Sequence, residues 1–173
     1  MNQLPTSRYQ NPVGIGRKKT NIMERTRIAL TRVAILATFV TAFTALAPAP
    51  AQAANTARRM YQVTNNSRAT NQVREVGIHY RISKLARKHS IAMANRGSIF
   101  HTSNPASFYL KGVKWSTWGE NVGSTGGTIT GLQAAFMNSP GHRSNILHRG
   151  FHRVAVGTYR ANGILWVTVF FYG

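Results

Sequence analysis

Three residues have the side chains and surroundings expected of a functional site: His101, Glu120 and His142. They lie in the segments "FHTSNPAS", "WGENV" and "NSPGHRSNIL". Each histidine follows a break in the chain, where side chains tend to point into clefts. Glu120 is conspicuous because the chain has only three acidic residues against 22 basic ones. Two neutral imidazoles and a carboxylate suit zinc or another divalent cation. Any acid–base catalysis would use the same three groups. The three residues are far apart in the sequence, so their spacing does not by itself define a site.

Other kinds of catalysis find less support in the sequence. A serine nucleophile could be Ser103, Ser139 or Ser144, but the chain has no Gly-x-Ser-x-Gly segment and no aspartate to orient a base. The absence of cysteine excludes a thiolate nucleophile, a thiolate metal site and disulfide bonds. Paired-carboxylate chemistry would need Glu75 beside Glu120. Glu75 lies in the charged segment "VREVG", which is typical of a solvated helix end.

The first part of the folded region is predicted to be helical. Apolar residues spaced three and four apart predict helices at Thr56–Arg74 and Ser83–Asn95, the second with Ser83 as N-cap and Gly97 as its stop. His89 lies on the apolar stripe of the second helix and is expected in the core. The remaining histidines have basic or turn-forming neighbours and no special context: His79, His148 and His152.

The second part changes from loops and short helices to extended chain. Residues 100–107 are expected to form a loop, and a short strand is expected within 113–123. Thr130 and Gln133 resemble a capping box that opens a helix; this helix ends at Ser139-Pro140-Gly141, and a short helix restarts at His142. The runs "RVAVGTYR" and "GILWVTVFFYG" are joined by Ala161-Asn162-Gly163, a strong hairpin signal. Helices followed by a hairpin predict an α+β domain in which helices cover a sheet.

The N-terminal segment is typical of a secretory signal peptide rather than of a fold. Basic residues precede an apolar run from Val33 to Leu46, and Ala51-Gln52-Ala53 forms a small-x-small cleavage site. The run has about 14 residues, short of the ~20 that an uncleaved membrane anchor needs. The leader is long, so Met23 is an alternative start. We expect cleavage after Ala53, a secreted protein, and a single domain at residues 54–173.

The expected mature chain is strongly basic. Removal of the leader takes away seven Lys or Arg and one Glu, which leaves 15 basic and two acidic residues and a net charge of +13. An exported protein with this charge adsorbs to anionic cell-envelope polymers and lipid headgroups. Alternatively, the charge only sets solubility. We expect no specific nucleic-acid partner and a monomer.

The motifs in this region resemble those of a known family. "FHTS", "GENV", "NSPGHRSNIL" and "GILWVTVFFYG" occur in the order and approximate spacing of the CAP superfamily, which comprises the cysteine-rich secretory proteins, antigen 5 and the pathogenesis-related 1 proteins. "NNSR" and "LARKHSIAMANRG" are similar to the family's first two helices. The resemblance covers essentially all of the expected mature chain and is to the short bacterial secreted form, whose domain is called SCP-like.

This resemblance implies a fold and a site. The fold would be a three-layer α-β-α sandwich with a central antiparallel sheet. His101, Glu120 and His142 would be three members of a tetrad of two histidines and two glutamates around an open cleft that binds a divalent cation. The second glutamate of the family's Trp-Tyr-x-Glu pattern would fall near Ser139, and Phe136 stands in place of the tryptophan. The missing carboxylate weakens an acid–base or peptidase interpretation.

Three functions remain open from the sequence. The first, which we favour, is a non-enzymatic binding module with a cation or small ligand in the cleft and a basic surface that associates with the anionic envelope. The second is a metal-dependent hydrolase of peptide or cell-wall material, with Glu120 as general base. The third is a carrier of a small hydrophobic ligand such as a lipid or sterol. It is suggested by a segment that packs equally well as ordinary core: Phe108, Tyr109, Leu110, Trp115 and Trp118.

Overall fold

The computed structural model describes residues 49–173, in which five helices and four strands form one contact-dense unit. The predicted signal peptide lies mostly outside the described residues. Helix α1 spans Ala49–Thr70, so the expected cleavage point after Ala53 falls within its first turns. The elements after it are β1 (Gly77–Ile78), α2 (Tyr80–Arg96), α3 (Pro105–Tyr109), β2 (Trp118–Thr125), α4 (Ile129–Asn138), α5 (Pro140–Leu147), β3 (Arg153–Ala161) and β4 (Ile164–Tyr172).

The sheet is mixed rather than wholly antiparallel. Its strand order is β1-β3-β4-β2, with β2, β3 and β4 antiparallel and the two residues of β1 parallel to β3. The buried Asn65 side chain fixes the chain that enters β1. Its amide nitrogen donates to the Val76 carbonyl oxygen at 3.1 Å, and its oxygen accepts from the Val76 nitrogen at 3.0 Å. The chain that enters the parallel strand is therefore held by a contact between residues eleven positions apart, Asn65 and Val76, which no local sequence pattern predicts.

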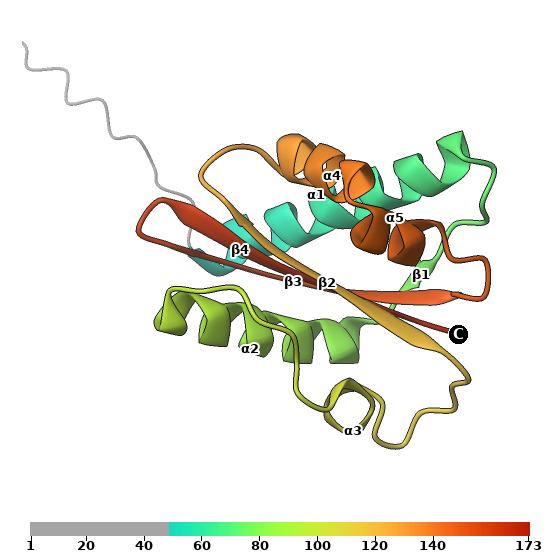
Figure 1. The fold of residues 1–173 in the computed structure, drawn as a ribbon. Coiled ribbons are helices and arrows are strands. Elements are labelled where there is room, and N and C mark those ends of the chain that lie inside the picture. The colour runs from blue at the N-terminus through green and yellow to red at the C-terminus, as the bar shows by residue number, and fades with distance from the viewer. Residues whose placement is uncertain (1–48) are drawn as a thin grey trace, which may run out of the picture. The chain divides into compact units, whose positions relative to one another are not determined.

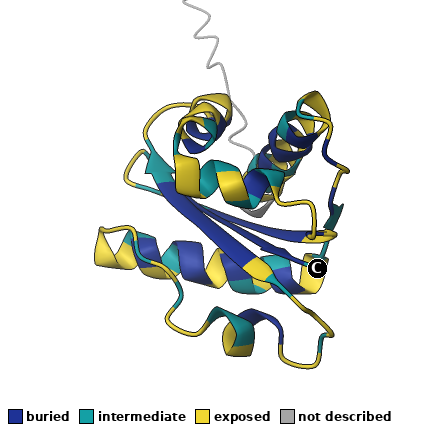
Figure 2. Ribbon diagram, turned by 45° about the vertical axis from the view of Figure 1, so that its right-hand side comes forward, coloured by how far each residue is buried: buried dark blue, intermediate teal, exposed yellow. Residues whose placement is uncertain are grey.

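Helices cover both faces of the sheet, as the resemblance implied. Helices α1, α4 and α5 lie on one face, and α2 with the short α3 lies on the other (Figure 1). The face of the sheet beneath α1, α4 and α5 packs around Phe136, Phe151 and Phe171. The opposite face packs around Ile82, Tyr109 and Phe170. The strands between the layers are buried over most of their length (Figure 2), and the three-layer α+β prediction is confirmed.

The helix ends differ from prediction where a capping side chain has another partner. Helix α2 begins at Tyr80 rather than Ser83, with His79 at the N-cap position. Ser83 does not cap the helix, and its hydroxyl accepts from the backbone nitrogen of Val156 on β3 at 3.1 Å. Helix α4 is capped by Thr128, whose hydroxyl accepts from the Gly131 nitrogen at 3.0 Å. The predicted capping box at Thr130 and Gln133 is therefore wrong. The Gln133 amide instead donates to the Ser67 hydroxyl on α1 at 2.9 Å.

Other predicted boundaries agree with the structure or shift by a few residues. Gly97 ends α2 with a positive φ of 69°, and the hairpin turns at Asn162 and Gly163 with φ values of 49° and 77°. The loop predicted at 100–107 contains the start of α3, which Asn104 caps by accepting from the Ser107 nitrogen. Helix α1 begins and ends earlier than predicted. Among the described residues, no helix has both the length and the apolar character needed to cross a membrane.

Candidate functional site

The Glu120 carboxylate is the buried centre of the site. Glu120 lies on β2 and is 4% exposed, and its two oxygens accept four hydrogen bonds. Oε1 accepts from the hydroxyls of Thr102 at 2.8 Å and Tyr109 at 2.9 Å. Oε2 accepts from the backbone nitrogen of Thr102 at 3.0 Å and from Nδ1 of His101 at 2.9 Å. A carboxylate has about four lone-pair positions, so these donors satisfy it completely.

These hydrogen bonds keep the carboxylate ionised despite its burial. Burial by itself raises the pKa of Glu120, but the bonds from Thr102, His101 and Tyr109 outweigh it and hold the pKa below its usual range. The same arrangement raises the pKa of Tyr109, chiefly through burial and also through the neighbouring carboxylate. Glu120 is therefore an anion at neutral pH, and Tyr109 is a neutral donor to it.

His101 is held at the surface by this carboxylate. An ionised carboxylate only accepts, so the His101 Nδ1 must carry the proton in this contact. The neutral ring then has its lone pair on Nε2, and its side chain is 61% exposed. The preceding residue is fixed as well, because Nε2 of the buried His89 lies 2.8 Å from the Phe100 carbonyl oxygen and the two rings meet edge to face. The core position predicted for His89 is confirmed. Its contacts with Phe100 hold the loop that carries His101.

His142 lies on α5, which covers the opposite face of the sheet from α3. Its carbonyl oxygen accepts from the side chain of Asn121 at 3.0 Å. The Asn145 amide donates to the Asn121 side-chain oxygen at 2.9 Å and to the Glu120 carbonyl oxygen at 3.2 Å. These two asparagines join α5 to β2. A Cβ on Gly119 would come within 2.5 Å of the Asn145 side chain, so only glycine leaves room for this junction.

The His142 ring packs against Phe136, with the ring centroids 4.7 Å apart. Burial lowers the pKa of His142, and the charge of a protonated His101 lowers it further. At neutral pH His142 is therefore a neutral imidazole, the form that binds metals.

The three predicted cation ligands do not all have a free lone pair for a metal ion. Within residues 49–173, no three His, Cys, Asp or Glu side chains are grouped so as to hold a metal ion. Glu120 has no lone pair to offer, because all four positions are already used. Its bond to His101 has the form of a carboxylate that orients a metal-binding histidine and increases its basicity. Neutral imidazole nitrogens are cation ligands by chemical type, and His101 and His142 are the imidazoles that the sequence singled out.

Several residues of the site were missed by the sequence reasoning. Thr102 and Tyr109 complete the carboxylate's hydrogen bonds, and Asn121 and Asn145 place α5. Three of the four lie inside the motifs that singled out the site, in "HTS", "GENV" and "HRSNIL", but only the histidines and the glutamate were considered. Ser139 is the junction between α4 and α5 and makes no side-chain capping bond.

The buried Arg68 holds the C-terminal end of α5, the helix that carries His142. Its side chain is fully buried on α1, and burial lowers its pKa. Nη1 donates to the Ile146 carbonyl oxygen at 2.7 Å, at the C-terminal end of α5 where the helix dipole favours a cation. The other carbonyls that accept from it belong to Arg74, His148 and Phe151. Arg68 thus fixes the end of α5 and the turn that leads into β3.

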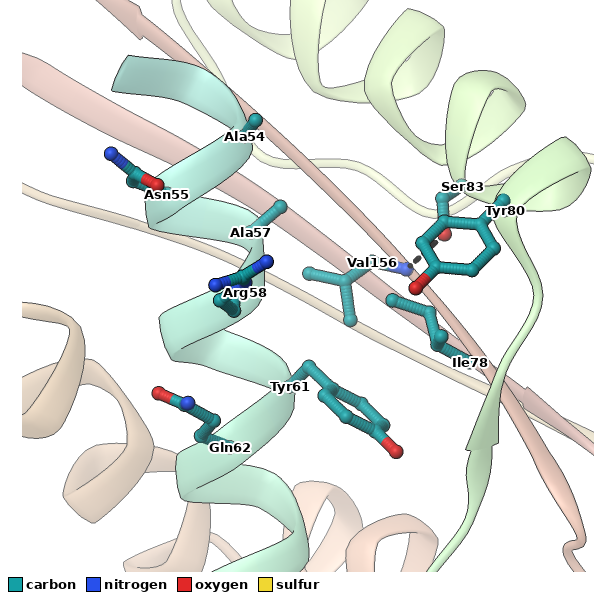
Figure 3. Close-up of a pocket in the computed structure, with 10 residues that line it drawn as sticks. All are labelled: Ala54, Asn55, Ala57, Arg58, Tyr61, Gln62, Ile78, Tyr80, Ser83 and Val156. Atoms are coloured by element: carbon teal, nitrogen blue, oxygen red, sulfur yellow. Dashed lines mark hydrogen bonds between the residues drawn. The ribbon is translucent and has the colours of Figure 1, made fainter. Parts of the chain in front are cut away.

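A separate pocket of about 450 Å³ lies between α1, β1 and the start of α2 (Figure 3). Tyr61, Ile78, Tyr80 and Val156 line it, with Arg58 on the α1 side. None of His101, Glu120 and His142 contributes to this pocket. The histidine site and the pocket are therefore different places on the molecule.

Comparisons with known proteins agree with the fold. The model of the CAP family, described as the cysteine-rich secretory protein family, matches residues 61–170. Uncharacterized protein YkwD of Bacillus subtilis (strain 168) is 30% identical over 127 residues, which cover 70% of this chain and 49% of that protein. The chain thus spans about half the length of this curated relative.

Solved structures share the fold. An extracellular protein containing an SCP domain from Bacillus anthracis str. Ames has a TM-score of 0.59 and 23% identity, over 69% of this chain and 40% of that one. An outer surface protein of Borrelia burgdorferi has a TM-score of 0.62 and 18% identity, over 68% of this chain and 92% of that one. With the family match covering most of the described residues, this chain belongs to the CAP family.

Proposed function

We propose that this chain is an exported CAP domain that binds rather than catalyses. In this proposal His101 and His142 hold a divalent cation, zinc first, or a small ligand. The basic surface holds the domain at the anionic cell envelope. The location is supported by structural neighbours that are described as an extracellular protein and an outer surface protein. It also agrees with the net charge of +13 expected for the mature chain.

The hydrogen bonding of Glu120 is the observation that carries the binding proposal. A general base must have a lone pair free to take a proton, and Glu120 would have to release one of four donors first. Its lowered pKa makes it a weaker base as well. The carboxylate is better placed to orient His101 than to activate water. The cation, if bound, would supply a positive charge to which an anionic or carbonyl ligand could coordinate.

Zinc binding to residues 49–173, which contain every described element, tests the cleft. We expect calorimetric titration to show binding that falls at least tenfold in H101A and in H142A, in line with the loss of a ligand. The matched control is H152A, because His152 is exposed and lies outside the site. Equal zinc affinity in the wild type, H101A and H142A would overturn the assignment of the cleft.

Two further measurements test the remaining parts of the proposal. Retention on an anionic polymer should decrease with salt, because exposed charges are screened; retention that ignores salt would refute the electrostatic part. Peptides and peptidoglycan fragments should not be turned over in the presence of zinc. Turnover that disappears in H101A and H142A would replace the binding proposal with the metal-dependent hydrolase.

A further inference from the structure

An exposed group of aromatic and lysine side chains lies between α3 and β2. It consists of Phe108 on α3, Lys111, Lys114 and Trp115 in the following loop, and Trp118 at the start of β2. Phe108, Trp115 and Trp118 are 40%, 44% and 39% exposed, whereas Tyr109 and Leu110 beside them are buried. We call these five residues the aromatic–lysine surface. Large aromatic side chains exposed together on one segment indicate a docking surface.

The aromatic rings at both ends of this surface rest on the core. Phe108 meets Tyr109 edge to face at 4.8 Å, Tyr109 stacks on Phe170 at 4.2 Å, and Trp118 also stacks on Phe170 at 6.2 Å between ring centroids. Phe108 and Trp118 are therefore held in place while a large part of each ring remains in solvent.

The loop that carries Trp115 is also fixed. The Gly173 carbonyl oxygen accepts from the backbone nitrogens of Ser116 at 2.7 Å and Thr117 at 3.1 Å, and from the Ser116 hydroxyl at 2.9 Å. At the other end, the Val113 nitrogen donates to the Leu110 carbonyl oxygen at 2.9 Å. Trp115 and the two lysines thus extend from an anchored loop, so little conformational entropy is lost when they dock.

The exposed charged side chains around this surface are positive. Lys111 and Lys114 are exposed within it. Beyond Trp118, the register places Tyr172 and then Arg153 across the same end of the sheet, and the charges of Arg153 and Arg81 act on Tyr172. Glu120 is the nearest acidic residue along the chain, and it is buried and already paired with His101.

We propose that the aromatic–lysine surface docks the domain on the interface of an anionic lipid bilayer. Tryptophan and phenylalanine rings insert at the level of the headgroups, and lysines beside them attract acidic lipids. A soluble polyanion would use the lysines but leave the exposed rings without a partner, which is why we favour a bilayer. This inference rests on the proposed function, in that the domain must reach the cell envelope. It adds a defined surface to a general attraction by net charge.

Docking would have a consequence for the histidine site. The buried Tyr109 contacts both regions, because its hydroxyl donates to Glu120 and its ring packs against Phe108. Its helix α3 follows the loop that carries His101 (Figure 1). A domain docked by this surface would hold its histidine site close to the membrane.

The test uses residues 49–173, which omit the apolar leader run, with vesicles of phosphatidylcholine alone or mixed with phosphatidylglycerol. We expect sedimentation with the mixed vesicles only, together with a blue shift of tryptophan emission and quenching by brominated lipid. Trp166 is 8% exposed, so the changes report on Trp115 and Trp118. W115A should lose about tenfold in partitioning, as expected from about 50 Å² of lost apolar contact with the lipid at about 25 cal/mol per Å². K111A/K114A should lose about 30-fold.

Matched variants distinguish local docking from general adsorption. K84A/R87A removes the same charge from exposed positions on α2, and Y80A removes another exposed aromatic ring. Both should bind vesicles within a few-fold of the wild type. Equal losses in K84A/R87A and K111A/K114A, with no emission shift, would overturn the inference while leaving the electrostatic part of the proposed function intact. Self-association that W115A abolishes, without vesicle binding, would likewise overturn it in favour of a second copy as the partner.

Discussion

Replacing Glu120 with glutamine keeps the shape of the side chain and removes its charge. The wild-type carboxylate accepts four hydrogen bonds between 2.8 and 3.0 Å. Glutamine offers one oxygen, which can accept from the Thr102 backbone nitrogen and from His101. Its NH₂ group must then face the hydroxyls of Thr102 and Tyr109, which have to rotate so that they accept.

The expected cost follows from the change in each hydrogen bond. Hydrogen bonds to a charged acceptor contribute about 1.5–3 kcal/mol each, and bonds between neutral groups contribute about 0.5–1.5 kcal/mol. Burying a neutral amide costs less than burying a carboxylate, which offsets part of this loss. We expect E120Q to lower the free energy of unfolding by about 2–3 kcal/mol at pH 7, on the basis of these values. In a domain of this size that corresponds to roughly 10 °C in Tm.

The pH dependence gives the sharper test. The folded-state pKa of Glu120 is lower than its value in the unfolded chain. The unfolded chain therefore binds the proton more readily, and this part of the stability is present above the unfolded pKa and is lost as pH falls through the folded pKa. Wild type and E120Q should differ most at neutral pH and converge in acid.

Urea unfolding of residues 49–173 from pH 7 down to pH 3 would measure both effects. E75Q is the matched control, because Glu75 is exposed and its replacement removes the same charge; we expect it to change stability by less than about 0.5 kcal/mol. Equal stability of the wild type and E120Q at pH 7 would refute the assignment of the four hydrogen bonds. A difference that stays constant down to pH 3 would refute the assignment of the lowered pKa.

Three further predictions concern packing, the buried arginine and the second histidine. In G157A the new Cβ would overlap the backbone of α2, so we expect a loss of about 3 kcal/mol in urea unfolding, whereas G141A, with open space around its Cβ, should be close to neutral. R68M would leave four carbonyl oxygens without their donor, and should lower the unfolding free energy by at least about 3 kcal/mol; a neutral result would mean that water replaces the guanidinium without cost. The His142 ring should titrate by NMR below pH 6.5 in the wild type and closer to it in H101A; an unchanged midpoint would show that the two imidazoles do not interact.

Local sequence signals predicted the elements they act on directly. Gly97 and the Asn162-Gly163 pair fix positive φ angles within a single turn, and both predictions are confirmed. The restart of a helix near His142 is also confirmed, with α5 beginning at Pro140. Predictions failed where a polar side chain had a distant alternative partner: Ser83 bonds to β3 and Gln133 to α1. A capping pattern states what a side chain can do locally, and tertiary contacts decide whether it does so.

The site shows the same division. The motifs selected His101, Glu120 and His142 as candidates, because rare or polar residue types stood out against a basic and apolar background. They could not assign roles, since the role of Glu120 depends on which donors surround its oxygens. Thr102 lies next to His101, but it is 18 positions from Glu120 in the sequence, and Tyr109 is 11 positions from Glu120.

The sequence by itself determined the family and the α+β class, and it selected His101, Glu120 and His142 as candidate site residues, because these follow from short motifs and local backbone preferences. Only the tertiary structure decided that Glu120 is saturated with hydrogen bonds and that most of the His101 side chain is exposed. The same holds for the aromatic–lysine surface, because its apolar residues are indistinguishable from core residues until burial separates Tyr109 and Leu110 from Phe108, Trp115 and Trp118. Burial and hydrogen-bond partners are properties of chain segments brought together from far apart, and no single segment contains them.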